Sequence, residues 1–250
     1  MQELIYGRNP IFECLRAGRR EVYKLVVAQG AKEKGFLADI TELARQQGIP
    51  VQRVERQQLD TVGKGINHQG VVAEVSGYPY AELDDILALA QTRKQPPWLL
   101  LLDCLQDPQN LGTLVRTAEV IGVHGTAILE RRAASVTPAV VSSSSGATEH
   151  AFIAQVTNLT RTIQELQARD VWVAGLEDVP SAQTVWEADL EGPLALVVGS
   201  EGQGMRRLVR ETCDFLVRLP ARGRVNSLNA AVAGSIALYE VARQRKIGLS

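Results

Sequence analysis

Cysteine is scarce in this sequence, and the few cysteines form no useful arrangement. Cys14, Cys104 and Cys213 are the three cysteines among 250 residues, and they lie far apart in the chain. An odd, scattered set lacks the pairing of a disulfide framework and the spacing of a metal site. We therefore expect reduced thiols, no bound metal and a cytoplasmic protein.

Long apolar runs are also missing. No segment has the length of a transmembrane helix, and Met1–Leu4 shows no basic-then-apolar signal pattern. The chain contains no internal repeat and no long low-complexity tract. Its 45% hydrophobic and 22% charged residues are typical of a globular protein with one or two domains. These features predict a protein without a membrane partner.

An excess of charge of either sign is absent, because the formal net charge is −1. The basic residues are nevertheless unevenly distributed. Residues 205–224 contain six arginines but only two acidic residues, and residues 1–24 contain five basic residues against three acidic ones. Guanidinium groups match phosphate geometry, so both segments are candidate phosphate contacts. The alternative is that they form solvated helical faces.

Apolar segments alternate with helical patterns along the chain, which predicts an α/β fold. We expect a small α/β domain over residues 1–76, a linker over 77–97 and a parallel-sheet domain over 98–250. Asn9 is the expected N-cap of the first helix, with Pro10 at its first position. The predicted strands are 23–28, 51–54, 71–75, 99–102, 126–129, 151–154, 171–175, 194–198 and 215–219. The predicted helices are 9–17, 32–47, 57–62, 84–92, 110–121, 137–142, 159–168, 205–211 and 228–245.

Polar residues gather just after two predicted strands and just before the apolar run 231–241 of the last predicted helix. The clusters are residues 106–112 with Arg116, residues 199–204 and residues 226–229. In open α/β sheets, ligands bind beyond the carboxyl ends of the strands. One polar residue is enough to cap a helix, so the surplus at 226–229 indicates a ligand, the alternative being a heavily capped loop.

Two common nucleotide-binding patterns are excluded. A dinucleotide-binding fold requires Gly-x-Gly-x-x-Gly after its first strand, but residues 103–106 contain no glycine. Gly199, Gly202 and Gly204 follow a late strand and have a different spacing. A P-loop requires Gly-Lys followed by Ser or Thr, a sequence that does not occur here.

Three segments resemble the motifs of the SpoU/TrmH (SPOUT) family. Residues 107–118 (DPQNLGTLVRTA) resemble motif 1, residues 198–204 (VGSEGQG) resemble motif 2, and residues 219–233 (from LP to NSLNAAVA) resemble motif 3, in the family's order. Residues 7–15 (GRNPIFECL) and 68–70 (HQG) are similar to the L30/L7Ae-related substrate-binding domain of the ribosomal RNA members. The resemblance covers the whole chain.

The resemblance implies S-adenosylmethionine-dependent methylation of a ribose 2′-OH in RNA, most like the type that modifies a guanosine of 23S rRNA. It also implies a homodimer and a reaction that requires no metal. The implied fold is a SPOUT domain with a deep trefoil knot, C-terminal to the L30/L7Ae-like domain. A tRNA substrate is one alternative. A non-catalytic RNA-binding or ribosome assembly factor is another, although such a factor need not keep the polar residues of the motifs.

The resemblance assigns the catalytic centre to Arg116, with Asn110 and Glu201 beside it and Ser227 and Asn229 as polar groups of the pocket. A guanidinium stays protonated and accepts no hydrogen bond, so we do not expect this arginine to act as a base. We instead expect Arg116 to hold a substrate phosphate and the nascent alkoxide. The alternatives are a surface salt bridge for Arg116, helix caps for the Asn and Ser residues, and a first-turn acid for Glu201.

The same resemblance places S-adenosylmethionine among Gly199, Leu219 and Leu228. Leucine side chains can pack against the apolar faces of adenine, and a glycine allows close approach of the backbone. The alternative for both leucines is an ordinary position in the core. Asn226 is a further candidate for the polar part of the pocket.

RNA contacts are expected in the N-terminal domain at Arg8, Arg19, Arg20 and His68. Residues 145–150, which end in His150, also resemble the family and are a candidate substrate contact. The alternative for His150 is a partly buried structural histidine.

Overall fold

Two sheets organise the chain, and each belongs to a separate compact unit. The computed structural model describes residues 2–30, 35–63, 66–224 and 227–247. The first unit comprises Met1–Pro79 with Val136–His150, and the second comprises Tyr80–Ser135 with Ala151–Ser250. The first unit therefore includes a segment from the middle of the sequence.

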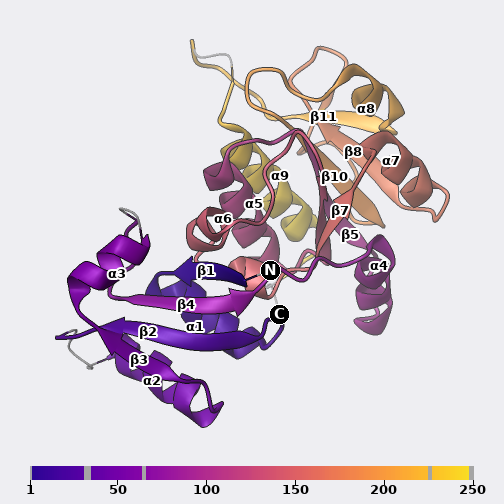
Figure 1. Cartoon of the computed structure of the whole chain (residues 1–250). Helices are drawn as coiled ribbons and strands as arrows, with labels where there is room; N and C mark the ends of the chain where they lie inside the picture. The colour runs from indigo at the N-terminus through magenta and orange to yellow at the C-terminus, as the bar shows by residue number, and fades with distance from the viewer. Residues whose placement is uncertain (1, 31–34, 64–65, 225–226, 248–250) are drawn as a thin grey trace. The chain divides into compact units, whose positions relative to one another are not determined.

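The first unit contains a four-stranded mixed sheet (Figure 1). The strand order is β1-β4-β2-β3, in which β2 and β3 are parallel and the other pairs are antiparallel. The strands are β1 (Gln2–Tyr6), β2 (Val22–Ala28), β3 (Val51–Val54) and β4 (Val71–Ser76). The helices are α1 (Arg8–Ala17), α2 (Phe36–Gln46), α3 (Arg56–Gly63) and α6 (Pro138–Ser143), with the 3-10 turn η1 (Ala147–Glu149). The prediction missed β1 because this edge strand buries only Ile5 and pairs with a strand that lies far along the sequence.

The first helix starts earlier than predicted, and the expected cap is wrong. Asn9 lies inside α1, and the N-cap is Gly7, whose φ of 92° allows the chain to turn directly out of β1. No side chain caps this end. Arg8 thereby becomes the first helical residue. The predicted helix over 32–47 is observed from Phe36, and residues 32–34 lie outside the described part of the chain.

The second unit contains a seven-stranded parallel sheet, as the sequence predicts. Its order is β7-β6-β5-β10-β8-β11-β9, and every recorded pairing is parallel. The strands are β5 (Trp98–Asp103), β6 (Gly125–Leu129), β7 (Ile153–Val156), β8 (Trp172–Leu176), β9 (Gln183–Thr184), β10 (Leu194–Gly199) and β11 (Phe215–Arg218). The two-residue strand β9 was not predicted. All residues of β5 and β10 are buried, which explains their continuous apolar sequences.

Helices cover both faces of this sheet (Figure 1). They are α4 (Leu83–Thr92), α5 (Pro108–Val120), α7 (Leu159–Gln167), α8 (Arg207–Thr212) and α9 (Ala230–Gln244). A Cβ on Gly234 of α9 would lie 2.7 Å from Leu114 of α5 and 3.1 Å from Val198, so α9 packs closely against both. Val197 instead belongs to a core cluster that includes side chains of α7 and α8. Because neighbouring strand residues point to opposite faces, α5 and α9 lie on one face and α7 and α8 on the other.

The order of the strands places a topological switch at the centre of the sheet. From β5 the chain proceeds outward to β6 and β7, and it later returns to place β10 on the other side of β5. Ligand sites in open α/β sheets lie at such a switch. Residues 80–97, expected to be a linker, belong to the second unit, where Ile86 of α4 is fully buried. The trefoil knot stays a prediction.

His124 offers a test of the second unit's stability. Its buried ring accepts a hydrogen bond at Nδ1 from the Trp98 backbone N–H (3.1 Å), and Nε2 lies 3.0 Å from Gln95 Oε1. Burial, with smaller contributions from Arg93 and Arg245, lowers the pKa of His124 to about 4. In an unfolded chain the pKa of a histidine is about 6.5.

We predict that the free energy of unfolding decreases by up to about 3 kcal/mol as the pH falls from about 6.5 to 4, because only the unfolded state gains a proton on His124 in that range. Above about pH 6.5 the contribution is fully present. Urea unfolding at a series of pH values should show a shallower pH dependence for His124→Gln. The same pH dependence in both proteins would contradict the prediction.

Candidate functional site

The carboxyl ends of the two central strands are tied together by a buried carboxylate. Asp103 and Gly199 are register partners at the ends of β5 and β10. The fully buried Asp103 accepts hydrogen bonds from the Arg206 backbone N–H (2.7 Å) and from Arg206 Nε (2.8 Å). Hydrogen bonding to this carboxylate raises the pKa of Arg206. The segment after β10 is therefore anchored at both ends.

Between these anchors, the chain makes a tight turn that requires glycine. Ser200 and Gly204 exchange two backbone hydrogen bonds of 3.1 and 3.0 Å, and Gly202 and Gly204 have φ values of 76° and 65°. A Cβ on Gly199 would lie 2.3 Å from the carbonyl carbon of Gly204 and 2.4 Å from the Met205 nitrogen. The close approach expected at Gly199 is thus an approach of the chain to itself.

A pocket of about 760 Å³ opens beside this turn. Its walls come from residues 176–178 at the end of β8, 198–204 at the end of β10, 218–223 at the end of β11, and the start of α9. All three predicted cofactor residues, Gly199, Leu219 and Leu228, line it, together with Glu201 and Ser227. Leu228 is 53% exposed, so its alternative as a core residue is wrong. Asn226 lies outside the described residues.

Polar side chains from the three motif segments meet next to the pocket. Asn110 donates from Nδ2 to Asp107 Oδ2 (2.9 Å) and to Glu201 Oε1. Asn229 donates from Nδ2 to Asn110 Oδ1 (3.1 Å). These bonds join residues that are 91 and 119 positions apart in the sequence. We call Asn110, Glu201 and Asn229 the polar cluster.

The structure shows which of these residues cap helices. Asp107, not Asn110, caps α5, since its Oδ1 accepts from the Gln109 N–H (3.0 Å). Glu201 lies in the turn over 200–204, before α8 begins, so the first-turn alternative is wrong. Asn229 caps α9 through its Oδ1, and its Nδ2 also donates a hydrogen bond to Asn110.

Arg116 lies farther along α5 and is exposed. It is six residues beyond Asn110, which corresponds to about 240° around the helix and about 9 Å along its axis. The pocket lining found in the described residues does not include Arg116. Its predicted catalytic role therefore stays a prediction.

The predicted RNA contact at Arg20 is not available to a ligand. Its side chain is fully buried, donates from Nη2 to the Ser76 carbonyl oxygen (2.7 Å), and contacts Glu3 and Glu149. Burial raises the pKa of Glu149 despite this arginine. The guanidinium thus stabilises the interior of the first unit, which corrects the expectation from charge alone.

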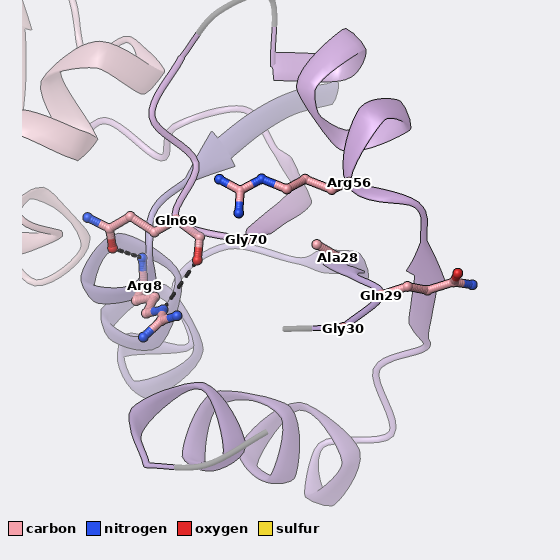
Figure 2. A pocket seen from close by; sticks show the side chains of 7 residues that line it. All are labelled: Arg8, Ala28, Gln29, Gly30, Arg56, Gln69 and Gly70. Carbon is pink, nitrogen blue, oxygen red and sulfur yellow. Dashed lines mark hydrogen bonds between the residues drawn. The ribbon is translucent and has the colours of Figure 1, made fainter. Parts of the chain in front are cut away.

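The other predicted RNA residues divide into two groups. Arg19 is half-buried and donates to the carbonyl oxygens of Pro79 (3.2 Å) and Glu149 (3.5 Å). His68 is buried, with Nε2 2.7 Å from Asp60 Oδ1 and Nδ1 accepting from the Gly70 N–H (3.0 Å). These contacts are structural. Arg8 alone of the four lines an open pocket, which also includes Arg56, a residue that the sequence analysis did not select (Figure 2).

Several remaining side chains have structural roles. His150 Nε2 lies 2.8 Å from Glu13 Oε2, in agreement with a partly buried structural histidine. Cys14, Cys104 and Cys213 are free thiols. Across the described ranges, no group of three or more His, Cys, Asp or Glu side chains could hold a metal ion. No helix in those ranges is long and apolar enough to cross a membrane.

Comparison with protein families gives two matches that together cover most of the chain. Residues 97–239 match the SpoU rRNA Methylase family. Residues 4–81 match the family described as RNA 2′-O ribose methyltransferase substrate binding. The two matches correspond to the motif-bearing sheet and to the smaller N-terminal sheet.

Individual relatives agree with these matches. YacO of Bacillus subtilis (strain 168), named as a TrmH family tRNA/rRNA methyltransferase, is 46% identical over 97% of this chain and 96% of its own. The crystal structure of the SpoU methyltransferase AviRb from Streptomyces viridochromogenes in complex with AdoMet superposes with a TM-score of 0.82 at 26% identity, covering 99% and 92% of the two chains. The A. aeolicus TrmH/SpoU tRNA modifying enzyme matches with a TM-score of 0.56 at 27% identity over 65% of this chain and 83% of its own.

Proposed function

The chain belongs to the SpoU/TrmH family of RNA methyltransferases, and from that premise we propose that it methylates a ribose 2′-OH of RNA with S-adenosylmethionine, at a guanosine of 23S rRNA. One observation carries the proposal. Gly199, Leu219 and Leu228, selected from the sequence as cofactor residues, line one pocket although they belong to three separate segments. The polar cluster lies beside it through Glu201.

The pocket residues fit S-adenosylmethionine. Pockets for small molecules commonly have volumes of about 300–1,000 Å³ and combine apolar walls with a few polar groups. Leu219 and Leu228 provide apolar surface for adenine. Glu177 also lines the pocket, and its Oε2 is a buried oxygen without a hydrogen-bond partner among the described residues. A ribose hydroxyl or the ammonium group of the cofactor would satisfy this acceptor.

When bound, S-adenosylmethionine supplies a methyl group activated by a cationic sulfur. The protein's residues then have to orient the ribose oxygen and stabilise the negative charge that develops on it. The guanidinium of Arg116 contributes this charge stabilisation while it holds a substrate phosphate. The proton of the 2′-OH passes to a phosphate oxygen or to water. Asn110 and Asn229 hold Glu201 and the polar side of the site in position.

Mapping of ribose methylation by mass spectrometry tests the substrate. We compare ribosomal and transfer RNA from cells that have and lack the protein. Loss of one 2′-O-methylguanosine in 23S rRNA is the expected result. Loss of a methyl group from tRNA instead would replace the rRNA assignment, and unchanged maps would contradict methylation. A folded protein that binds no S-adenosylmethionine at millimolar concentration would favour a non-catalytic assembly factor.

We also propose that the protein is a homodimer. Helix α9 has three exposed apolar side chains at helical spacing, Val232, Ile236 and Tyr239, and Val120 at the end of the neighbouring α5 is 64% exposed. Exposed apolar surface of this kind is typical of an interface, and a second copy of the chain would cover it.

Substitution of Tyr239 by arginine is expected to shift the protein toward monomer, because a charge would be buried in the interface. Sedimentation velocity at micromolar concentration measures the change. Leu208→Arg is the matched control, since Leu208 is comparably exposed but lies on α8, on the opposite face of the sheet. A dimer that persists in Tyr239→Arg would overturn this interface.

A further inference from the structure

The first unit has a pocket of its own, with a volume of about 610 Å³. Figure 2 shows that its lining comes from four places in the sequence: the start of α1, the end of β2, the start of α3 and the turn before β4. Arg56 extends from α3 across the pocket toward Gly70, while Gln29 points away from it. The lining residues are Arg8, Ala28, Gln29, Gly30, Arg56, Gln69 and Gly70.

The charge of this pocket is uncompensated. Two guanidinium groups line it, and no carboxylate is among the lining residues. Arg8 is half-buried, and no described residue bonds its terminal Nη atoms; Arg56 likewise has no hydrogen bond or ion pair with a described residue. Other arginines of the same unit are paired, Arg16 with Glu13 and Arg20 with Glu149. The two pocket arginines are therefore available to an anionic ligand.

The backbone holds Arg8 in place for such a ligand. Arg8 Nε donates to the Gln69 carbonyl oxygen (3.3 Å), and the Arg8 backbone N–H donates to Gln69 Oε1 (3.2 Å). Gln69 and Gly70 have φ values of 53° and 84°, so this turn uses two successive left-handed residues. The buried His68 ring supports the turn by accepting from the Gly70 N–H. His68 thus acts as a positioning residue, one step removed from the pocket.

We propose that this pocket binds one unpaired nucleotide of the RNA substrate, with Arg8 on a phosphate and the planar guanidinium of Arg56 against the base. The proposal rests on the proposed RNA methylation and adds a second, separate contact with the substrate. Single-stranded RNA presents splayed bases that stack on arginine planes, whereas bases inside a duplex are not free to enter a pocket. Gly30 and Gly70 lack side chains, so they leave room for a base.

The test measures RNA affinity of the full-length protein by fluorescence anisotropy. The probes are a single-stranded RNA of ten nucleotides and the same sequence as a duplex. We expect Arg8→Gln and Arg56→Gln each to weaken single-strand binding about tenfold, and to lower the slope of log K against log salt by about 0.7 per lost phosphate contact, chiefly in Arg8→Gln. Duplex affinity should stay within about twofold of the wild type.

Arg16→Gln is the matched control, since it removes the same charge from α1 at an exposed position outside the pocket. It should leave single-strand affinity unchanged. Arg56 is exposed and has no described partner, so Arg56→Gln is expected to remain folded, which the urea midpoint verifies. S-adenosylmethionine binding should be unaffected in all three variants.

Each remaining outcome decides between the proposals. If the Arg8→Gln and Arg56→Gln variants lose single-strand and duplex affinity equally, the pocket contacts only the phosphate backbone, and the unpaired-nucleotide proposal is wrong. If neither falls, the pocket does not bind RNA at all, although methylation in the wild type would still uphold the proposed function.

Discussion

Replacing Gly199 by alanine is expected to weaken S-adenosylmethionine binding by at least about a hundredfold, equivalent to about 2.7 kcal/mol. The added methyl group would lie 2.3 Å from the Gly204 carbonyl carbon and 2.4 Å from the Met205 nitrogen. Both contacts are with backbone, so no side-chain rotation can relieve them. The turn over 200–204 has to move, and that turn is a wall of the pocket. Isothermal titration calorimetry measures the loss.

Gly192→Ala is the matched control for this substitution. A Cβ at Gly192 would meet no atom within 4 Å, and its backbone does not require glycine. The Gly192→Ala variant should bind S-adenosylmethionine with the same affinity as the wild type. Because Gly199→Ala can also lower stability, Leu228→Ala provides a second test at an exposed pocket residue, where we expect about tenfold weaker binding. Unchanged affinity in both pocket variants would refute this pocket as the cofactor site.

Replacing Arg116 by lysine is expected to lower kcat by about 10²–10³, with little change in S-adenosylmethionine affinity. Lysine keeps the positive charge but loses the planar fork that contacts a phosphate and the reacting oxygen together. Single-turnover methylation of the substrate RNA measures the chemical step. Cofactor affinity should be preserved, because Arg116 is not among the residues that line the pocket.

Arg161→Lys makes the same chemical change at a neutral position. Arg161 is an exposed arginine of α7 that pairs with Glu165 at 3.0 Å, an interaction of small energetic value at the surface. The Arg161→Lys variant should methylate the substrate RNA at the wild-type rate. Near-normal turnover of Arg116→Lys would show that a point charge is sufficient, and the proposed two-contact role of the guanidinium would be wrong.

Local sequence patterns predicted the elements that bury continuous apolar runs. β5 and β10 were predicted within a residue at each end, because six successive buried positions in a parallel sheet leave little ambiguity. β9 was missed because it has only two residues, and β1 was missed because it acquires its strand geometry from a partner about 70 residues farther along the chain. The cap at Asn9 was wrong because a left-handed glycine at Gly7 starts the helix earlier.

In the candidate site, too, some residues could be predicted from the sequence and others only from the folded structure. Gly199, Leu219 and Leu228 could be selected from the motifs, and the structure places them around one pocket. Charge alone could not separate Arg8, which lines a pocket, from Arg20, whose carboxylate partners Glu3 and Glu149 lie 17 and 129 positions away. Arg56 belongs to no motif that the sequence analysis identified. Only the folded first unit brings it into the same pocket as Arg8 (Figure 2).

By itself, the sequence determined the α/β class, the central strands and the chemical identity of the motif residues, because these depend on local periodicity and on side-chain chemistry. The tertiary structure alone decided which charged groups are buried in ion pairs and which remain exposed to solvent. It also decided that segment 136–150 joins the first unit and that Asn110, Glu201 and Asn229 share hydrogen bonds. The physical reason is that the desolvation and pairing of a charge depend on neighbours that are distant in sequence.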